Sequence, residues 1–343
     1  MLYEKVGGSV ARCNVCQWRC LIHPGKLGVC RMRRNDGGTL VVLNYGFASS
    51  AAIDPIEKKP LFHFYPGSKV FSLGTLGCNF HCADCQNWQI ACSDFGEHDL
   101  HQVTAAEAVA QTKKYGCRGI AWTYNEPAIW FEYTLDCARM AKAQGLYTVY
   151  VTNGYMTAEA LDTIGPYLDA YRVDVKGFSD AFYRKLARLP RWRGILEVAE
   201  RAQSKWSMHV EVVTNVVPTM NDDEEQLGGI AHWASESLGE LTPWHLTRFY
   251  PNYQVTNLPP TPVATLEKAY DIGKRAGLKF VYLGNVPGHE LENTNCYQCG
   301  KLVIQRSGYD TSVIGTKDSH CAYCGAEMNI KTEAWKRATT VSV

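Results

Sequence analysis

Cysteine is the residue type whose number and spacing in this sequence most directly indicate chemistry. The chain has 343 residues and 14 cysteines. Most of them fall into groups with the short spacing of metal ligands: Cys13, Cys16, Cys20 and Cys30; Cys78, Cys82 and Cys85; Cys296, Cys299, Cys321 and Cys324. Cys92, Cys117 and Cys137 stand alone, and we expect them to be buried apolar thiols. Because no secretory signal precedes them, the grouped cysteines indicate metal sites rather than disulfides.

The central group is a C-x3-C-x2-C motif that cannot complete a structural zinc site by itself. Such a site takes four protein ligands, and Cys78, Cys82 and Cys85 supply three. Three thiolates can instead hold three irons of a [4Fe-4S] cubane and leave the fourth iron open for an exchangeable ligand. The motif therefore predicts a cluster with one free coordination position.

The motif and its place after a predicted strand resemble the radical S-adenosylmethionine (SAM) superfamily, and the chain is similar to pyruvate formate-lyase activating enzymes. The segments TLGCNFHCADCQNWQI, TYNEP, YVTNGY, DVKGF, CYQCG and CAYCG look closer still to radical SAM enzymes of the AmmeMemoRadiSam system. This resemblance implies that SAM binds the open iron and is cleaved reductively to a 5′-deoxyadenosyl radical. The superfamily usually has an aromatic residue before the third cysteine, whereas Asp84 stands here, so Phe80 and Trp88 are the candidates for the missing adenine contact.

The two flanking groups each offer four thiols. The C-terminal group consists of two C-x2-C knuckles, each followed by glycine, which is typical of a zinc ribbon, with rubredoxin-type iron as the alternative. Such a closed site indicates a structural or partner-docking role. The N-terminal group, with His23 nearby as a substitute ligand, predicts either zinc or a second [4Fe-4S] cluster, and we slightly prefer zinc.

Alternating strand and helix patterns must position these groups. We predict strands near residues 70–76, 119–124, 147–152, 170–175, 209–216, 244–249 and 280–283. Helices are predicted near residues 105–115, 129–143, 158–164, 181–186, 222–234 and 262–276, with a capping box at Thr104 and N-caps at Thr157, Ser179 and Asn221. The pattern predicts an α/β fold, a partial (β/α)6 TIM-type barrel of the radical SAM kind over residues 67–290. Residues 1–66 and 291–343 are expected to be small Cys-rich metal-binding segments, the second zinc-ribbon-like.

Polar residues stand where the predicted strands end, which is the edge where barrels of this kind bind ligands. By resemblance, Glu126 accepts from the SAM ammonium group; the alternative is a charge that favours a helix N-terminus. Asn153 can bond the SAM ribose or its own turn. Asp174 and Lys176 share one face of a strand end, and the resemblance implies SAM contacts for both, with a local salt bridge as the alternative. Asn215 is expected, by resemblance, to approach the adenosine.

The composition is that of an ordinary globular protein, with 46% hydrophobic and 20% charged residues. Lys and Arg number 35 against 34 Asp and Glu, so no overall field indicates nucleic acid or an anionic membrane, although the basic stretch at residues 31–34 keeps RNA open as a substrate. No signal peptide or membrane-spanning stretch is predicted. We therefore expect a cytoplasmic protein without a membrane partner.

The leading hypothesis is an enzyme that cleaves SAM and abstracts hydrogen from a protein, an RNA or a small molecule. Its cluster needs an external electron, which implies a flavodoxin or ferredoxin-type reductant, and the resemblance adds AMMECR1-like and Memo-like proteins as expected partners. The alternative is a non-catalytic metal-binding adaptor that docks partner proteins through its Cys knuckles. The order of Glu126, Asp174 and Lys176 along the barrel favours the enzyme.

Overall fold

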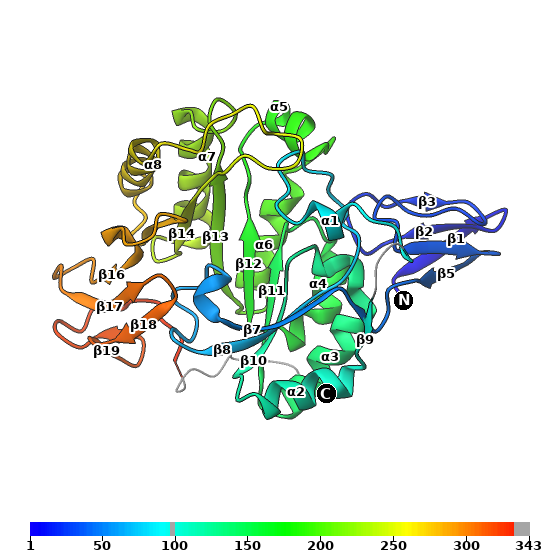
Figure 1. The fold of residues 1–343 in the computed structure, drawn as a ribbon, viewed down its shortest axis with the longest axis horizontal. Helices are drawn as coiled ribbons and strands as arrows, with labels where there is room; N and C mark the ends of the chain where they lie inside the picture. Colours follow the sequence, from blue (N-terminus) through cyan, green and yellow to red (C-terminus); the bar gives the residue numbers. More distant parts are fainter. Residues whose placement is uncertain (97–99, 333–343) are drawn as a thin grey trace.

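A large, mostly parallel sheet forms the centre of the molecule (Figure 1). The computed structural model describes residues 1–96 and 100–332. Within that part of the chain, the sheet has eight strands in the order β15-β14-β13-β12-β11-β10-β8-β7. They are β7 (Ser50–Pro55), β8 (Lys69–Gly74), β10 (Gly119–Trp122), β11 (Tyr147–Thr152), β12 (Ala170–Asp174), β13 (His209–Val216), β14 (Trp244–Arg248) and β15 (Val281–Gly284). All neighbours from β8 to β15 pair in parallel, so the carboxyl ends of these strands meet at one edge.

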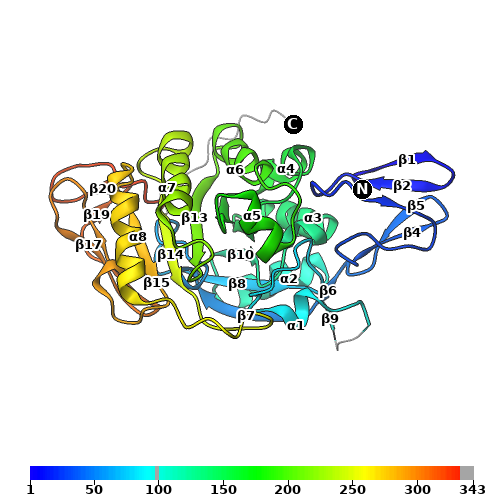
Figure 2. The ribbon, with the colours of Figure 1, turned by 90° about the horizontal axis from the view of Figure 1, so that it is seen from above.

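Helices connect the parallel strands and pack around one face of the curved sheet (Figure 2). The longer ones are α2 (Ala105–Lys114), α3 (Phe131–Ala143), α4 (Ala158–Ile164), α6 (Gly194–Ser204), α7 (Glu224–Trp233) and α8 (Val263–Arg275). The short helices α1 (Trp88–Ala91) and α5 (Asp180–Phe182) lie in loops, and a 3-10 turn, η2 (Pro127–Trp130), precedes α3. Among the described residues, no helix has the length and apolar character needed to cross a membrane. The alternation confirms the predicted partial TIM-type barrel.

Local capping explains where several helices begin. Thr104 and Glu107 form the predicted capping box, and the side chains of Thr157 and Ser179 cap α4 and α5 as predicted. The predicted cap at Asn221 is wrong, because Asp223 accepts from the backbone of α7 instead.

The amide of Asn221 serves a different purpose. Its nitrogen donates to the carbonyl oxygens of Lys176 (2.6 Å) and Asn215 (2.8 Å), which ties the ends of β12 and β13 together. Helix α6 was not predicted, because Arg193 at its N-cap makes no side-chain capping bond and gives no start signal.

The N-terminal lobe (residues 1–48) lies at one end of the barrel (Figure 1, blue). It contains the paired strands β1 (Tyr3–Gly7), β2 (Val10–Cys13) and β3 (Leu21–Ile22), the hairpin β4 (Arg33–Asp36) and β5 (Thr39–Val42), and β6 (Phe47–Ala48), which pairs with β9 (His101–Gln102). The predicted boundary at residue 66 differs from the structure. Strand β7 pairs antiparallel with β8, from Ser50 opposite Gly74 to Pro55 opposite Lys69, and so belongs to the barrel sheet.

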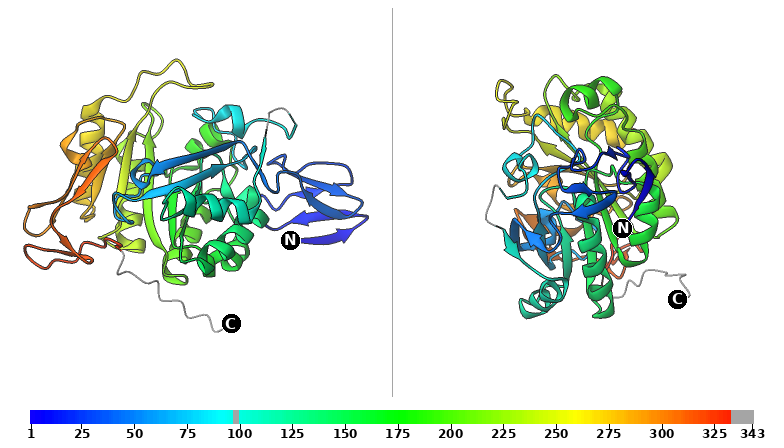
Figure 3. Two further views of the ribbon diagram at one scale, coloured as in Figure 1. Left: turned by 60° about the horizontal axis from the view of Figure 1, so that its bottom comes forward. Right: turned by 90° about the vertical axis from the view of Figure 1, so that its right-hand side faces the viewer.

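The C-terminal ribbon (residues 293–332) lies at the opposite end (Figure 3). Its strands are β16 (Thr294–Asn295), β17 (Leu302–Ser307), β18 (Asp310–Val313), β19 (Thr316–Lys317) and β20 (His320–Cys321); the rest of the predicted segment, 333–343, lies outside the described residues. Buried Arg306 fixes the ribbon to the barrel. It donates to Phe62 O (2.8 Å) and Glu292 O (3.0 Å), and its guanidinium lies 4.0 Å from the centroid of the Phe62 ring.

A buried carboxylate, Glu211 on β13, connects the barrel interior to the segment before β8. One oxygen accepts from Phe62 N (3.0 Å) and His245 Nε2 (2.6 Å), and the other accepts from His63 N (2.8 Å) and His209 Nε2 (2.9 Å). Burial opposes ionisation, but these hydrogen bonds outweigh it and hold the pKa of Glu211 well below its usual range. Both oxygens are thus fully used by the protein.

We predict that Glu211→Ala destabilises the fold by about 3–5 kcal/mol, because it leaves several buried donors without an acceptor. The shift in the urea midpoint of unfolding, followed by circular dichroism, measures this. Glu224→Ala is the control, since the Glu224 side chain is 79% exposed in its pair with Arg275. Equal midpoints for the two variants would contradict a stabilising role for Glu211.

Candidate functional site

The central cysteine triplet lies on the loop after β8, at the carboxyl edge of the barrel sheet. Cys78, Cys82 and Cys85 are half-buried and line one cavity of about 460 Å³. Burial raises the pKa of all three thiols, that of Cys85 to about 11. The backbone N–H of Phe80 donates to Cys78 Sγ (3.4 Å), a contact that favours a thiolate.

The three sulfur atoms are not arranged to share one metal ion. Two sulfurs that are each about 2.3 Å from a zinc ion cannot be more than about 4.6 Å apart. Among the described residues, the only group of three or more potential ligands whose ligand atoms all lie within 4.8 Å of one another is Cys296, Cys299, Cys321 and Cys324. The wider triplet therefore fits a group with several metal ions, such as a cubane that offers one iron to each thiolate.

Glu126 follows β10 and is buried in the wall of the same cavity. Its carboxylate accepts from Thr152 Oγ1 (2.7 Å), Asn153 N (2.8 Å) and Ala128 N (2.9 Å), the last as the N-cap of η2. Burial nevertheless raises the pKa of Glu126 to about 7. The helix-end role considered from sequence is real, and because a carboxylate has about four acceptor positions, Glu126 can still accept from a ligand in the cavity.

Asn153 lies just after β11 and also lines the cavity. Its Oδ1 accepts from Tyr155 N (3.0 Å), which is the own-turn bond considered from sequence. Its Nδ2 donates to Asn79 Oδ1 (2.7 Å), beside Cys78. Asn153 therefore holds the cysteine loop against the end of β11.

The end of β12 brings three charges into the cavity. Arg172, Asp174 and Lys176 alternate along the chain and all line it, as the period of a strand requires. Asp174 pairs with Arg172 and with Lys176, whose Nζ lies 3.3 Å from Asp174 Oδ2. Burial opposes charge on Lys176, but Asp174 and Cys82 outweigh it and raise its pKa. The local salt bridge considered from sequence is present, and Lys176 remains a cation in the cavity.

No role in the site was predicted for Asp84, which lies in the cysteine loop. It lines the cavity, where burial raises its pKa, while Lys176 and a hydrogen bond with Asn215 oppose that rise. Asn215 lies within β13 and its Oδ1 accepts from Thr247 Oγ1 (3.3 Å). Of the two aromatic candidates, Phe80 lines the cavity, whereas Trp88 stacks on Tyr253 with ring centroids 5.1 Å apart.

Sequence reasoning missed a group of residues contributed from outside the parallel strands. Lys58 and Lys59 follow β7, line the cavity and both pair with Asp54, at 2.8 and 2.7 Å. Tyr124 OH also donates to Asp54 (2.7 Å), and Lys59 Nζ lies 4.5 Å from the Tyr124 ring centroid. Burial lowers the pKa of Lys59 to about 8 although Asp54 opposes this. Tyr309 of the ribbon completes this side of the cavity.

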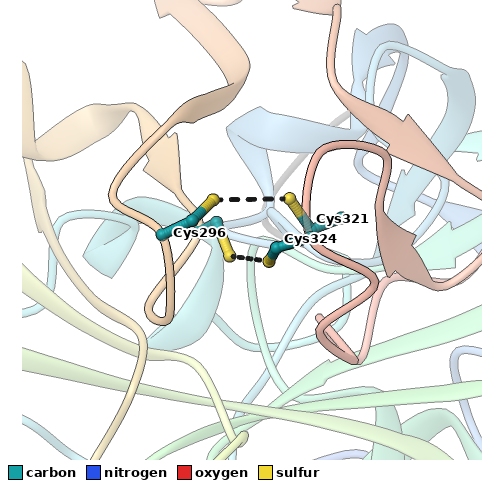
Figure 4. Close-up of side chains that lie close together, drawn as sticks. Cys296, Cys321 and Cys324 are labelled. Carbon is teal, nitrogen blue, oxygen red and sulfur yellow. Dashed lines mark hydrogen bonds between the residues drawn. The ribbon is translucent and has the colours of Figure 1, made fainter.

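The predicted C-terminal metal site is assembled. Figure 4 shows thiols from two turns of the ribbon facing one another. The sulfurs of Cys296 and Cys324 are 3.5 Å apart, and those of Cys299 and Cys321 are 3.8 Å apart. These separations match a tetrahedron of thiolates about 2.3 Å from one ion.

The predicted N-terminal group also converges. Cys13, Cys16, Cys20 and Cys30 line one small cavity together with Arg33 and with Ile129 of η2. Unlike the ribbon cysteines, they do not form a set of sulfurs within 4.8 Å among the described residues. The two flanking groups therefore differ in geometry, although both consist of four thiols.

Sequence comparison finds a matching family model and several similar proteins. The family model described as the Radical SAM superfamily matches residues 73–228. An uncharacterized protein of Methanocaldococcus jannaschii is 41% identical over 332 residues, which cover 96% of this chain and 98% of that protein. The pyruvate formate-lyase-activating enzyme of Clostridium pasteurianum is 26% identical over 183 residues, covering 49% of this chain and 72% of that enzyme.

Solved structures include similar chains with low sequence identity. A radical SAM methyltransferase from Sphaerobacter thermophilus has a TM-score of 0.49 and 15% identity, covering 64% of this chain and 67% of that one. A domain of a pyruvate-formate lyase-activating enzyme from Bacteroides vulgatus has a TM-score of 0.43 and 14% identity, covering 49% of this chain and 99% of that one. The family match and the cysteine loop after the first parallel strand show that residues 73–228 of the chain form a domain of the radical SAM superfamily, and by sequence the chain is similar to pyruvate formate-lyase activating enzymes.

Proposed function

We propose that this chain is an enzyme that cleaves SAM reductively and uses the resulting radical to abstract hydrogen from a substrate. The observation that carries the proposal is one cavity lined by Cys78, Cys82 and Cys85 together with Glu126 and Lys176. A [4Fe-4S] cluster held by the thiols would supply the open iron and the electron that breaks the C–S bond of SAM. The remaining residues of the cavity would bind and orient SAM.

The charges in the cavity suit the two charged ends of the methionine part of SAM. We assign Glu126 to its amino group, because the carboxylate has acceptor capacity left in a place shielded from water. Lys176 is assigned to the SAM carboxylate, with Asp174 positioning its ammonium group. Asn153 holds the loop that bears Cys78, and we assign Asn153 to the ribose of SAM. Asn215 and Asp84 form a polar contact on the side of the cavity that we assign to adenosine.

We extend the proposal to metals and partners. Zinc is proposed for the ribbon on its sulfur separations. A flavodoxin or ferredoxin-type protein would supply the electron in the cytoplasm, and AMMECR1-like and Memo-like proteins are proposed partners on family resemblance. Lys58, Lys59 and Tyr309 border the part of the cavity not assigned to SAM, so we place the substrate there, whether protein, RNA or small molecule.

Cys82→Ala is expected to abolish 5′-deoxyadenosine release, because two thiolates cannot hold a cubane that needs three. The measurement is chromatography of the products after anaerobic incubation of the reconstituted protein with dithionite and SAM. Zinc content at the ribbon should stay unchanged, since Cys82 is remote in sequence and in a different cysteine group.

Cys117→Ala is the matched control, because this buried thiol belongs to none of the three groups and its loss should leave release intact. No release from wild-type protein with a full cluster would refute the enzyme and favour the metal-binding adaptor. Joint loss of zinc and activity in Cys82→Ala would show that the two sites are not independent.

The ionisation of Glu126 should appear in the affinity for SAM. Its pKa is raised to about 7, so the carboxylate is charged above that pH and neutral below it. A neutral carboxyl attracts the amino group of SAM less, so the wild-type Kd should rise as the pH falls through about 7, by about tenfold in all. Glu126→Gln should weaken binding by about tenfold at pH 8 and remove this pH dependence.

Equilibrium dialysis of SAM against the reconstituted protein between about pH 6 and about pH 8 tests this. Exposed Glu236→Gln, outside the cavity, should behave like wild type. A wild-type Kd that does not change over this range, or a Glu126→Gln curve with the wild-type slope, would remove Glu126 from the proposed SAM site.

A further inference from the structure

The N-terminal lobe gathers four thiols that the proposed SAM chemistry does not use. Cys13 ends β2, Cys16 and Cys20 lie in the loop before β3, and Cys30 precedes β4. Cys13, Cys16 and Cys30 are buried and Cys20 is half-buried around one small cavity. The four side chains thus face one another across this cavity, from three separate segments of the lobe.

The separation of these sulfur atoms distinguishes the two metals that the sequence left open. The ribbon cysteines show what a site for one ion looks like in this structure, with sulfur pairs 3.5 and 3.8 Å apart. Among the described residues, the N-terminal thiols do not include three or more sulfur atoms that all lie within 4.8 Å of one another. The same is true of the central triplet. The N-terminal group thus resembles the triplet rather than the ribbon.

We propose that Cys13, Cys16, Cys20 and Cys30 bind a second [4Fe-4S] cluster rather than zinc. Four irons at the corners of a cube place their thiolates farther apart than one zinc ion does, which fits the wider spacing. Four thiolates occupy all four irons, so this cluster has no position for SAM. Buried Arg33 also lines the cavity, and its guanidinium is held by a two-point pair with Glu132 (3.0 and 2.7 Å).

The lobe contacts the central cysteine loop directly. A Cβ atom on Gly77, which has a φ of +83°, would lie 2.7 Å from the carbonyl oxygen of Cys30, so only glycine allows this approach. Trp18, between Cys16 and Cys20, donates from Nε1 to the carbonyl oxygen of Asn79 (2.8 Å). The residues beside Cys78 therefore touch the loops that hold the N-terminal thiols.

Because of this contact, we assign the second cluster a role in electron transfer to the central cluster. This role rests on the proposed function. One electron passes from a reduced flavodoxin or ferredoxin-type protein to the N-terminal cluster and then to the cluster at Cys78, Cys82 and Cys85. The N-terminal cluster gains and loses one electron in each cycle, and no bond to it forms or breaks. Half-buried Cys20 marks the side of this group nearest to solvent.

The metal content of anaerobically reconstituted protein tests the second cluster. Wild type should hold about eight irons and about eight sulfides for one zinc, and Cys20→Ala should hold about four irons with the zinc retained. Cys82→Ala should also lose about four irons, leaving the N-terminal cluster visible by electron paramagnetic resonance after reduction. Cys117→Ala is the control and should keep the wild-type inventory.

Cys30→Ala provides a second variant, and circular dichroism reports whether each variant is folded. About four irons and about two zinc ions in wild type would overturn the proposal. So would a folded Cys20→Ala and a folded Cys30→Ala that both keep the wild-type iron content. None of these readouts depends on SAM cleavage, so a failure of the proposed function would be seen separately, as absence of 5′-deoxyadenosine with dithionite.

Stopped-flow spectroscopy tests the relay. In Cys20→Ala, reduction of the central cluster by reduced flavodoxin should slow at least tenfold, whereas reduction by dithionite, a small molecule that needs no docking surface, should stay within about twofold of wild type. An unchanged rate with flavodoxin would overturn the relay even if the iron inventory confirms the cluster.

Discussion

The polar wall of the cavity depends on the buried carboxylate of Glu126, which joins separate segments of the chain. It accepts from Thr152 and Asn153 at the end of β11 and from Ala128 in η2. Asn153 continues the chain of hydrogen bonds to Asn79, beside Cys78. Because these bonds are buried, water competes with them weakly, and they position the cysteine loop relative to the neighbouring strands. A residue that the family resemblance assigns to SAM therefore also supports the loop that would hold the cluster.

The two terminal segments lie at opposite ends of the barrel, and one contacts the cysteine loop while the other lines the cavity. The N-terminal lobe presses on the cysteine loop at Gly77, and the ribbon contributes Tyr309 to the cavity lining. The ribbon keeps its place through buried Arg306, which is hydrogen-bonded to the backbone of Phe62, and Phe62 in turn donates to Glu211 inside the barrel. These buried contacts connect the ribbon to β13 in the barrel interior.

The parts of the structure that were predictable from sequence are those encoded by local patterns. The barrel strands are short apolar runs, and each ribbon knuckle brings its two thiols together within four residues. Lys59 and Asp54 were missed because β7 reaches the cavity only by pairing with β8, a long-range contact without a local signal. Asn221 looked like a helix cap because its amide suits that role, yet it bonds the carbonyls of two strand ends. The separation of the sulfur atoms in the N-terminal group is likewise a property of the folded lobe.

The central and N-terminal cysteine groups each have a cation nearby, whereas the ribbon has exposed thiols. Burial raises the pKa of Cys82 and Cys30, so ionising either thiol costs free energy that a nearby cation must offset. Lys176 has this effect on Cys82, and Arg33 has it on Cys30. In the ribbon, Cys299 and Cys324 are exposed, and solvent can stabilise their thiolates. Asp174 pairs with Lys176 and Glu132 pairs with Arg33, so each of these cations is fixed in place beside the thiol whose ionisation it favours.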